Sequence, residues 1–309
     1  VDRSMLAQAT AIEGIVEDAN LDYWTLEISP GFGTRYLEIA RGEKTLAGSL
    51  ATLDPQGLAN GFYTLRLTGR DIAGRVSIAT ALIEINSTGK LGQYQRQETD
   101  FVIDLGGVPF TLVRQYDSLT AEVRGSFGAG WDLLGRDLRI ETNVSPSGRE
   151  HVGVYNPYTD WTRLYLTLPT GARVAFSFAP PLEFVGQIPF YRPAWIADKA
   201  DGWTLSSVDT MLAKSGAKYF DATNGQAYNP ASPAYSGTDF TLTGPDGTRY
   251  LIDVARGTQE IVRADNSRLL VSDSGIVGPG GAMLQFVRDG QGRIVRAAAP
   301  DGTGVIYQY

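Results

Sequence analysis

The sequence contains no cysteine and a single histidine, and both shortages narrow the possible functions. Without cysteine, the chain has no disulfide framework, no thiol nucleophile and no thiolate metal ligand. With His151 as its one imidazole, it cannot build a metal site from two histidines of the same chain. We expect His151 at the surface, because it follows the polar residues Arg149 and Glu150, and we expect no catalytic residue, metal or cofactor.

Basic clusters and long apolar runs are also missing. The chain has 27 basic and 34 acidic residues, a formal net charge of -7, so it lacks the surface that binds nucleic acid or an anionic membrane. No segment approaches the run of about 18 apolar residues that a transmembrane helix needs. The first residues do not have the pattern of a signal peptide either. We expect no nucleic-acid partner, no membrane insertion and an export signal, if there is one, outside these residues.

What the chain has is a globular composition, with 43% hydrophobic residues in a length of 309 that favours two domains. Its first part consists of short runs of alternating polarity separated by turn residues. Trp24, Leu26 and Ile28 fall on one face of such a run, as in a half-buried strand. The pattern predicts an all-β fold that begins with an immunoglobulin-like or fibronectin-like β-sandwich at residues 1–88. Tyr63 is a candidate tyrosine corner of that sandwich, with an ordinary core aromatic as the alternative.

A polar segment at residues 86–93 contains the predicted domain boundary, and one turn recurs in the second predicted domain, residues 89–309. Proline presets the first turn position, and glycine accepts the positive φ that completes the reversal. Each copy should fold a strand back on its predecessor, so we expect an extended antiparallel β-sheet meander. The copies lie at residues 169–173, 245–249 and 300–304, with looser relatives at 265–268 and 289–293.

Two other segments of this domain carry specific expectations. Residues 180–193 contain four prolines and should form a long surface loop, because proline donates no hydrogen bond to a sheet. Residues 206–214 favour a pair of strands over a short helix. The loop at residues 198–202 is interpreted as a turn, with a calcium site as the weaker alternative.

Three motifs in the boundary region resemble the start of the repeat region in bacterial RHS-repeat (YD-repeat) proteins, and the similarity covers essentially the whole chain. They are a Gly-x-Pro, an Arg-x-Tyr-Asp-Ser and a Gly-x-Phe-Gly-x-Gly-Trp. Their residues are Gly107, Pro109, Arg114, Tyr116, Asp117, Gly125, Phe127, Gly128, Gly130 and Trp131. Gly128 and Gly130 are residues that allow a tight turn or a close backbone approach, and Trp131 can fill the space beside them. Arg114 and Asp117 are candidates for a hydrogen-bonded pair, with separate surface charges as the alternative.

The resemblance implies a structural segment of a large exported protein. In that family a sandwich is followed by strands that spiral into a cage, which encloses a toxin or presents a surface module. The partners would be the rest of the shell and an enclosed C-terminal domain, and the protein would be secreted or held at the cell surface. The family's self-cleavage residues belong to the far end of the repeats, so none carries over. The last strand, residues 305–309, lacks a following partner, and we therefore expect the chain to be part of a longer protein.

The alternative function is a cell-surface adhesion module that binds glycans. Sugar rings stack on exposed aromatic side chains, although large aromatics more often fill cores. The candidate contacts are Trp161, Tyr165, Tyr191, Trp195 and Trp203. A third hypothesis, a glycosidase, requires two facing carboxylates, and the sequence singles out no such pair.

Overall fold

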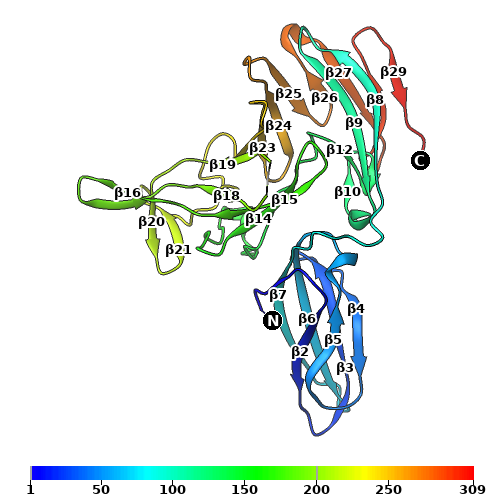
Figure 1. The fold of residues 1–309 in the computed structure, drawn as a ribbon, viewed down its shortest axis with the longest axis vertical. Coiled ribbons are helices and arrows are strands. Elements are labelled where there is room, and N and C mark those ends of the chain that lie inside the picture. The colour runs from blue at the N-terminus through cyan, green and yellow to red at the C-terminus, as the bar shows by residue number, and fades with distance from the viewer. Residues whose placement is uncertain (1, 200) are drawn as a thin grey trace. The chain divides into compact units, whose positions relative to one another are not determined.

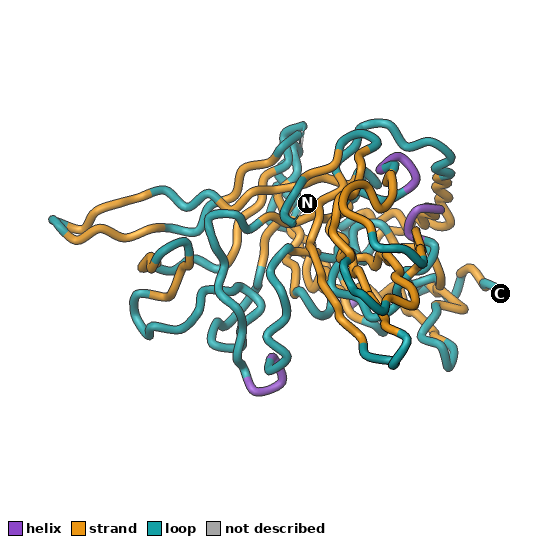
Figure 2. Tube along the Cα trace, turned by 90° about the horizontal axis from the view of Figure 1, so that it is seen from below, coloured by secondary structure: helices purple, strands orange, loops and turns teal. Residues whose placement is uncertain are grey.

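The computed structural model describes residues 2–199 and 201–309, and in these ranges the predicted all-β fold is confirmed (Figure 1). Strands and loops make up nearly all of the trace, and the helical segments are short turns (Figure 2). No helix in the described ranges has the length and apolar character needed to cross a membrane. The helical turns are η1 (Pro55–Gly57), η2 (Ser118–Thr120), η3 (Glu150–Val152) and η4 (Pro279–Gly281).

The chain forms two compact units. The first contains the residues up to Gln93 together with Glu141–Ser145, and the second contains Tyr94–Ile140 and Pro146–Tyr309. Residues 89–93, which we expected to begin the second domain, therefore belong to the first unit. Lys90 accounts for this, because its Nζ donates hydrogen bonds to the carbonyl oxygens of Pro55 at 3.0 Å and Leu58 at 2.6 Å.

The first unit contains a five-stranded sheet in the order β1-β7-β6-β3-β4 and a two-stranded sheet, β2-β5. Every pairing is antiparallel except the short parallel contact between β1 and β7. The strands are β1 (Met5–Leu6), β2 (Thr10–Val16), β3 (Leu21–Pro30), β4 (Leu37–Gly42), β5 (Leu46–Leu53), β6 (Gly61–Asp71), β7 (Val76–Ile85) and β13 (Glu141–Thr142).

One hydrophobic core lies between these two sheets. Ile12 and Leu50 enter it from the two-stranded sheet, and Leu65 and Ile83 enter it from the larger one. The predicted inward face of β3 is confirmed, because its three apolar residues are all buried: Trp24, Leu26 and Ile28.

Tyr63 shows the hydrogen bond that defines a tyrosine corner. Its hydroxyl donates to the carbonyl oxygen of Ala59, four residues upstream, at 3.0 Å. Tyr63 lies near the start of β6, directly after the connection from β5, and its ring packs in the core. Of the two alternatives for Tyr63, the tyrosine corner is therefore correct and the ordinary core aromatic is not. The hydrogen bond holds the connection that crosses from one sheet to the other.

We expect Tyr63→Phe to destabilise the first unit by about 1 kcal/mol, since it removes one partly buried hydrogen bond and leaves the ring in place. Urea unfolding of the full chain measures the change. Tyr94→Phe is the matched control, because Tyr94 is exposed and outside the first unit's core. Equal stabilities of the two variants would contradict a structural role for the Tyr63 hydroxyl.

The second unit contains a nine-stranded antiparallel sheet in the order β19-β22-β23-β24-β25-β26-β27-β28-β29, so the predicted meander is confirmed within the described residues. A three-stranded sheet, β12-β9-β8, packs against it around a core that includes Phe110, Leu133, Leu269 and Phe286 (Figure 1). The meander strands are β19 (Thr204–Ser207), β22 (Phe240–Thr243), β23 (Arg249–Asp253), β24 (Gly257–Val262), β25 (Arg268–Ser272), β26 (Gly275–Val277), β27 (Met283–Arg288), β28 (Ile294–Ala298) and β29 (Gly304–Ile306).

The smaller sheets of this unit are made of short hairpins. Residues 206–214 contain the end of β19, at Ser207, and the start of β20, at Leu212, and no helix. The expected pair is nevertheless wrong, because the two strands lie in different sheets: β19 pairs with β22, and β20 pairs with β21. The remaining strands are β8 (Gln95–Asp104), β9 (Pro109–Asp117), β10 (Arg124–Gly125), β11 (Gly128–Ala129), β12 (Trp131–Leu133), β14 (Arg163–Thr167), β15 (Arg173–Phe178), β16 (Leu182–Val185), β17 (Ile188–Tyr191), β18 (Trp195–Ala197), β20 (Leu212–Ser215) and β21 (Lys218–Asp221).

The expected loop at residues 180–193 is wrong, because this segment contains the β16–β17 hairpin. Pro189 is tolerated in β17 because of its register. Val185 pairs with Ile188 across a two-residue loop, so the next pair, Phe184 with Pro189, takes the position at which an antiparallel ladder makes no hydrogen bond. The missing N–H of Pro189 therefore breaks no bond to β16.

The recurrent turn has one hydrogen-bond pattern. In the copy that begins at Gly244, its N–H donates to the carbonyl oxygen of Thr248 at 2.8 Å, and the N–H of Gly247 donates back to Gly244 at 3.0 Å. Gly247 has a φ of +80°, as in a type I turn followed by a bulge. The same two bonds close the turns at residues 168–172, 263–267, 289–293 and 299–303. The predicted common turn is thus confirmed as a geometric unit.

Acid is expected to weaken these turns. Hydrogen bonds from the backbone N–H and hydroxyl of Thr248 lower the pKa of Asp246, and Thr303 lowers the pKa of Asp301 in the same way. A folded pKa below the unfolded value of about 3.9 means that the stabilisation is complete at neutral pH and is lost as the pH falls from that value through the folded pKa.

Urea unfolding at about pH 7 and about pH 3 tests this expectation. The Asp246→Asn, Asp301→Asn double variant should lose less stability between the two pH values than the natural chain does. Identical losses in the two proteins would show that these carboxylates do not support the turns.

Candidate functional site

The residues of the boundary motifs meet around the guanidinium of Arg114 in β9. Its Nη2 donates to Oδ1 of Asp100 at 2.8 Å, and its Nε binds the other oxygen of that carboxylate. The hydroxyl of Tyr307, from the last residues of the chain, donates to Oδ2 of Asp100 at 2.8 Å. The rings of Phe127, Trp131 and Tyr307 lie 5.0–5.6 Å from the guanidinium carbon. We call these five residues the Arg114 cluster.

Asp100 reaches Arg114 because β8 contains a bulge. The register between β8 and β9 pairs Thr99 with Val113 and Phe101 with Leu112, so Asp100 is the extra residue. A bulge redirects a side chain that regular alternation would send elsewhere. The carboxylate therefore approaches Arg114, and its side chain is 10% exposed.

The expected pair between Arg114 and Asp117 is wrong. The two residues are three apart in β9, and residues at that spacing point to opposite faces of a strand. Asp117 instead accepts a hydrogen bond from the backbone N–H of Leu119 at 2.9 Å and caps η2. It also accepts one from Nε2 of Gln95 at 3.0 Å, so its role is local.

The glycines of the motif permit close approach, as the sequence predicted. A Cβ on Gly130 would lie 2.8 Å from the ring of Tyr116, and a Cβ on Gly125 would lie 2.1 Å from the carbonyl oxygen of Trp131. Gly128 has a φ of +103°. Trp131 packs against Tyr116 with the ring centroids 5.3 Å apart, so an aromatic residue does fill the space beside these glycines.

The Gly-x-Pro motif forms the turn before β9. The N–H of Gly107 donates to Oδ1 of Asp104 at 2.7 Å, and β9 begins at Pro109. Gly107 has a φ of +89°, a conformation that favours glycine. These residues set the start of the strand that carries Arg114.

The electrostatics of the cluster favour a fixed structure. Burial and the hydrogen bond to Asp100 raise the pKa of the Tyr307 hydroxyl, and the same carboxylate raises the pKa of Arg114. Both groups therefore keep one protonation state across the neutral range. A guanidinium and a phenol that both stay protonated there suit structural support better than general acid–base chemistry.

Two further carboxyl groups near the Arg114 cluster, those of Asp132 and Asp137, are held by an ion pair and by hydrogen bonds. Burial raises the pKa of Asp132 to about 7, while the guanidinium of Arg139, its ion-pair partner, acts to lower it. Asp137 accepts hydrogen bonds from the backbone N–H groups of Ser126 and Leu133, each at 2.8 Å. These bonds hold the loop between β10 and β12 in place.

The five candidate glycan contacts do not share one exposed surface. Tyr165 is 1% exposed, so its assignment as a contact is wrong: the sheet that carries it is covered on both faces. The rings of Trp195, Tyr191 and Trp203 pack against Phe178, Tyr219 and Tyr250 respectively. Trp161 is 58% exposed.

The remaining sequence candidates lie at the surface or in ion pairs. His151 is exposed in η3. Both carboxylate oxygens of Asp198 bind the guanidinium of Arg163, at 3.1 and 2.5 Å, which leaves the side chain engaged without calcium. Ala200, in the same expected turn, lies outside the described residues. In the part of the chain that the structure describes, no three acidic or histidine side chains gather as a metal site.

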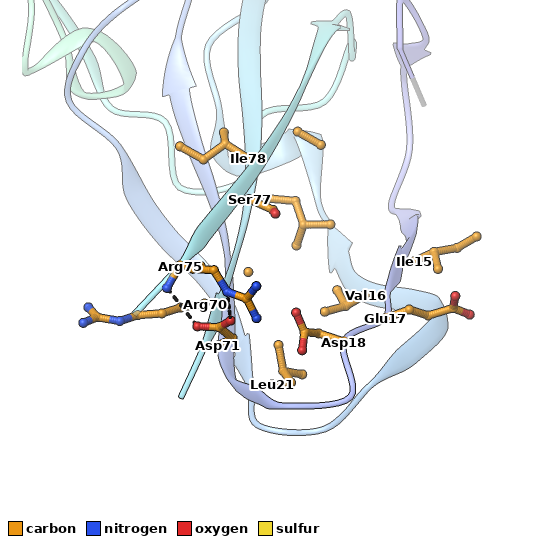
Figure 3. Close-up of a pocket in the computed structure, with 13 residues that line it drawn as sticks. Ile15, Val16, Glu17, Asp18, Leu21, Arg70, Asp71, Arg75, Ser77 and Ile78 are labelled. Atoms are coloured by element: carbon orange, nitrogen blue, oxygen red, sulfur yellow. Dashed lines mark hydrogen bonds and ion pairs between the residues drawn. The ribbon is translucent and has the colours of Figure 1, made fainter. Parts of the chain in front are cut away.

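Sequence reasoning missed a pocket in the first unit, between the end of β2 and the beginning of β7 (Figure 3). Its volume is about 390 Å³, and its apolar lining includes Val16, Leu21 and Leu67. On β7 it is bounded by Ser77 and Ala79. The sequence did contain a signal for this pocket. Ser77 and Ala79 are small, yet they lie on the face of β7 that carries the large buried residues Ile83 and Ile85 further along the strand.

Comparison of the chain with models of known protein families and with curated proteins finds no match.

Proposed function

We propose that the chain is a non-enzymatic structural segment, whose second unit begins the wall of an RHS-type β-shell and whose first unit is its plug or foundation. The observation that carries the proposal is the nine-stranded meander, in which one repeated turn joins β22 to β23, β24 to β25, β27 to β28 and β28 to β29. A sheet of this kind can be lengthened by further copies of the same hairpin, because each strand pairs mainly with its sequence neighbours.

The two faces of the meander differ in burial, as we expect for the wall of a shell. Along β25, Leu269 and Val271 are buried in the core, whereas Leu270 is 57% exposed. The covering sheet, β12-β9-β8, supplies the other side of that core. One face of the meander thus packs against the sheet that carries the boundary motifs. The opposite face is open to solvent or to a domain that the shell encloses.

The Arg114 cluster supports the same proposal. It joins β8 and β9, at the start of the unit, to Tyr307, which follows the last strand. Segments about two hundred residues apart in sequence thereby meet in one ion-paired, ring-lined cluster. Such a cluster fixes where the meander lies on the covering sheet.

The first unit supports an immunoglobulin-like assignment within this proposal. Two sheets face each other across one core, a buried tryptophan lies on the third strand, and a tyrosine corner follows the connection between the sheets. These are features of immunoglobulin-like sandwiches. In the proposed protein, which is secreted or held at the bacterial cell surface, the partners are the rest of the shell and the domain that it encloses.

The DNA sequence downstream of the codon for Tyr309, in the gene that encodes the chain, tests the proposal. We expect an open reading frame with further hairpin repeats of the Tyr-Asp type, followed by a distinct C-terminal domain. A stop codon directly after Tyr309, or a continuation without such repeats, would contradict it.

A further inference from the structure

The hairpin formed by β16 and β17 carries large apolar side chains that are exposed. Figure 1 shows this hairpin reaching out from the rest of the second unit. Its large apolar residues with 49–67% exposure are Leu182, Phe184, Val185 and Ile188. Apolar side chains gathered at one exposed point mark a surface that another molecule covers.

These side chains lie on both faces of the hairpin. Cross-strand partners share a face, so Phe184 lies beside Pro189 on one face. Val185 lies beside Ile188 on the other face, and all four residues are exposed. A partner sheet would cover one face and leave the other in water, whereas a hydrocarbon layer surrounds an inserted tip on all sides. The arrangement therefore favours a lipid surface over a folded protein.

The tip of the hairpin is uncharged and poor in backbone donors. No charged residue occurs between Glu183 and Arg192. Phe184 and Pro189 take the position at which the ladder makes no hydrogen bond, so their backbone groups face outward, and proline has no N–H. Because an unsatisfied backbone group raises the cost of entering hydrocarbon, the missing N–H of Pro189 makes insertion of the tip less costly.

Polar contacts hold the base of the hairpin. Nη1 of Arg192 donates to both carboxylate oxygens of Asp209, at 3.0 and 2.8 Å, and its Nε donates to Glu183 at 3.2 Å. The ring of Tyr191 packs against Tyr219 with the ring centroids 5.5 Å apart. The hairpin thus has an ion-paired base, an aromatic level above it and an apolar tip, an order that suits the interface of a membrane.

The neighbouring hairpin of the same sheet has a polar tip. β20 and β21 form this second hairpin of the sheet β16-β17-β20-β21. Lys214, Ser215 and Lys218 lie at or beside its turn, and all three are exposed. A place at the end of a hairpin in this sheet therefore does not by itself explain the apolar tip of β16 and β17.

We propose that the tip of the β16–β17 hairpin, residues 184–189, inserts into a bilayer of zwitterionic lipid. From Phe184 to Gly186 the strand and its turn extend about 10 Å, the depth that apolar groups reach at the boundary of headgroups and acyl chains. Anionic lipid adds no attraction, because the tip is uncharged and the chain has a net charge of -7. Sequence reasoning predicted no membrane insertion from the absence of long apolar runs and basic clusters, and a tip of this length registers as neither.

Insertion of the tip is independent of the function proposed for the meander. That sheet would be lengthened beside β29, whereas the hairpin belongs to the sheet β16-β17-β20-β21. Failure of the vesicle experiments below would therefore leave the structural role of the second unit untouched.

Vesicles of phosphatidylcholine and a single fluorescent label test the insertion. Because the chain has no cysteine, Gln187→Cys supplies one thiol at the tip for a nitrobenzoxadiazole dye, whose emission rises in apolar surroundings. Val102→Cys, at an exposed position of β8, carries the control label. We expect vesicles to raise the emission of the label at position 187 and to leave that at position 102 unchanged. No rise at position 187, or an equal rise at both positions, would overturn the proposal.

Unlabelled variants measure what the apolar side chains contribute. In flotation with the same vesicles at about 0.1–5 mM lipid, the Phe184→Ser, Ile188→Ser double variant should bind at least about tenfold more weakly than the natural chain. Val102→Ser removes a similarly exposed apolar side chain elsewhere in the second unit, and it should bind like the natural chain. Thermal unfolding reports whether each variant is folded. Equal binding of the natural chain and the double variant would contradict insertion.

Two further results would assign the hairpin a different role. Binding that requires phosphatidylserine in the vesicles and disappears in about 1 M salt would indicate a charged surface instead of an apolar tip. Analytical ultracentrifugation that shows a dimer of the natural chain, which the double variant disrupts, would assign the tip to a second copy. Either result would overturn the proposal.

Discussion

Arg114→Met should destabilise the second unit by about 3–5 kcal/mol, the range for removing one partner of a buried ion pair. The side chains of Arg114 and Asp100 are 23% and 10% exposed, so the substitution leaves a carboxylate with little access to water. It also removes the cation from three aromatic rings. Urea unfolding of the full chain, followed by tryptophan fluorescence, measures the loss.

Arg268→Met is the matched control for Arg114→Met. Arg268 forms an ion pair with Glu260 on the meander, but its side chain is 63% exposed, and such a pair contributes about 1 kcal/mol or less. A loss at Arg114 no larger than the loss at Arg268 would show that the Arg114 cluster does not hold the meander on its covering sheet.

Gly125→Ala should destabilise the same unit by about 3 kcal/mol or more, because the new methyl group would meet backbone. Its Cβ would lie 2.1 Å from the backbone carbonyl oxygen of Trp131 in β12 and equally close to Oδ1 of Asp132. Overpacking of a closely packed site costs about 1–3 kcal/mol even where side chains can adjust. Differential scanning calorimetry of the full chain gives the change in unfolding temperature.

Gly290→Ala tests whether the effect at Gly125 is steric. Gly290 has open space around its Cβ position and no left-handed φ, so its substitution should leave the unfolding temperature almost unchanged. Similar shifts for Gly125→Ala and Gly290→Ala would remove the steric explanation of the Gly-x-Phe-Gly-x-Gly-Trp motif.

The features that the sequence predicted are those that local chemistry determines. The turn around Asp246 and Gly247 needs only a proline, an aspartate and a glycine in order, and it forms with the expected hydrogen bonds. The alternation of Trp24, Leu26 and Ile28 likewise needs only a strand with one buried face. Because these signals lie within a few residues, the meander and the strands of the first unit could be predicted.

The features that were missed depend on contacts between distant residues. Asp100 binds Arg114 only because the register between β8 and β9 shifts at that residue, and no local pattern marks the shift. Tyr165 stands on the less apolar face of its strand, yet a second layer buries it. Lys90 looked like part of a linker, but its ammonium binds carbonyl groups of the first unit.

The most direct test of the account is a structure of the natural full-length protein by electron cryo-microscopy. The account predicts that a strand beyond Tyr309 pairs with the outer edge of β29 and continues the meander as the wall of an enclosed space. A structure in which β29 ends the sheet, with the second unit instead forming a substrate-binding cleft, would contradict it.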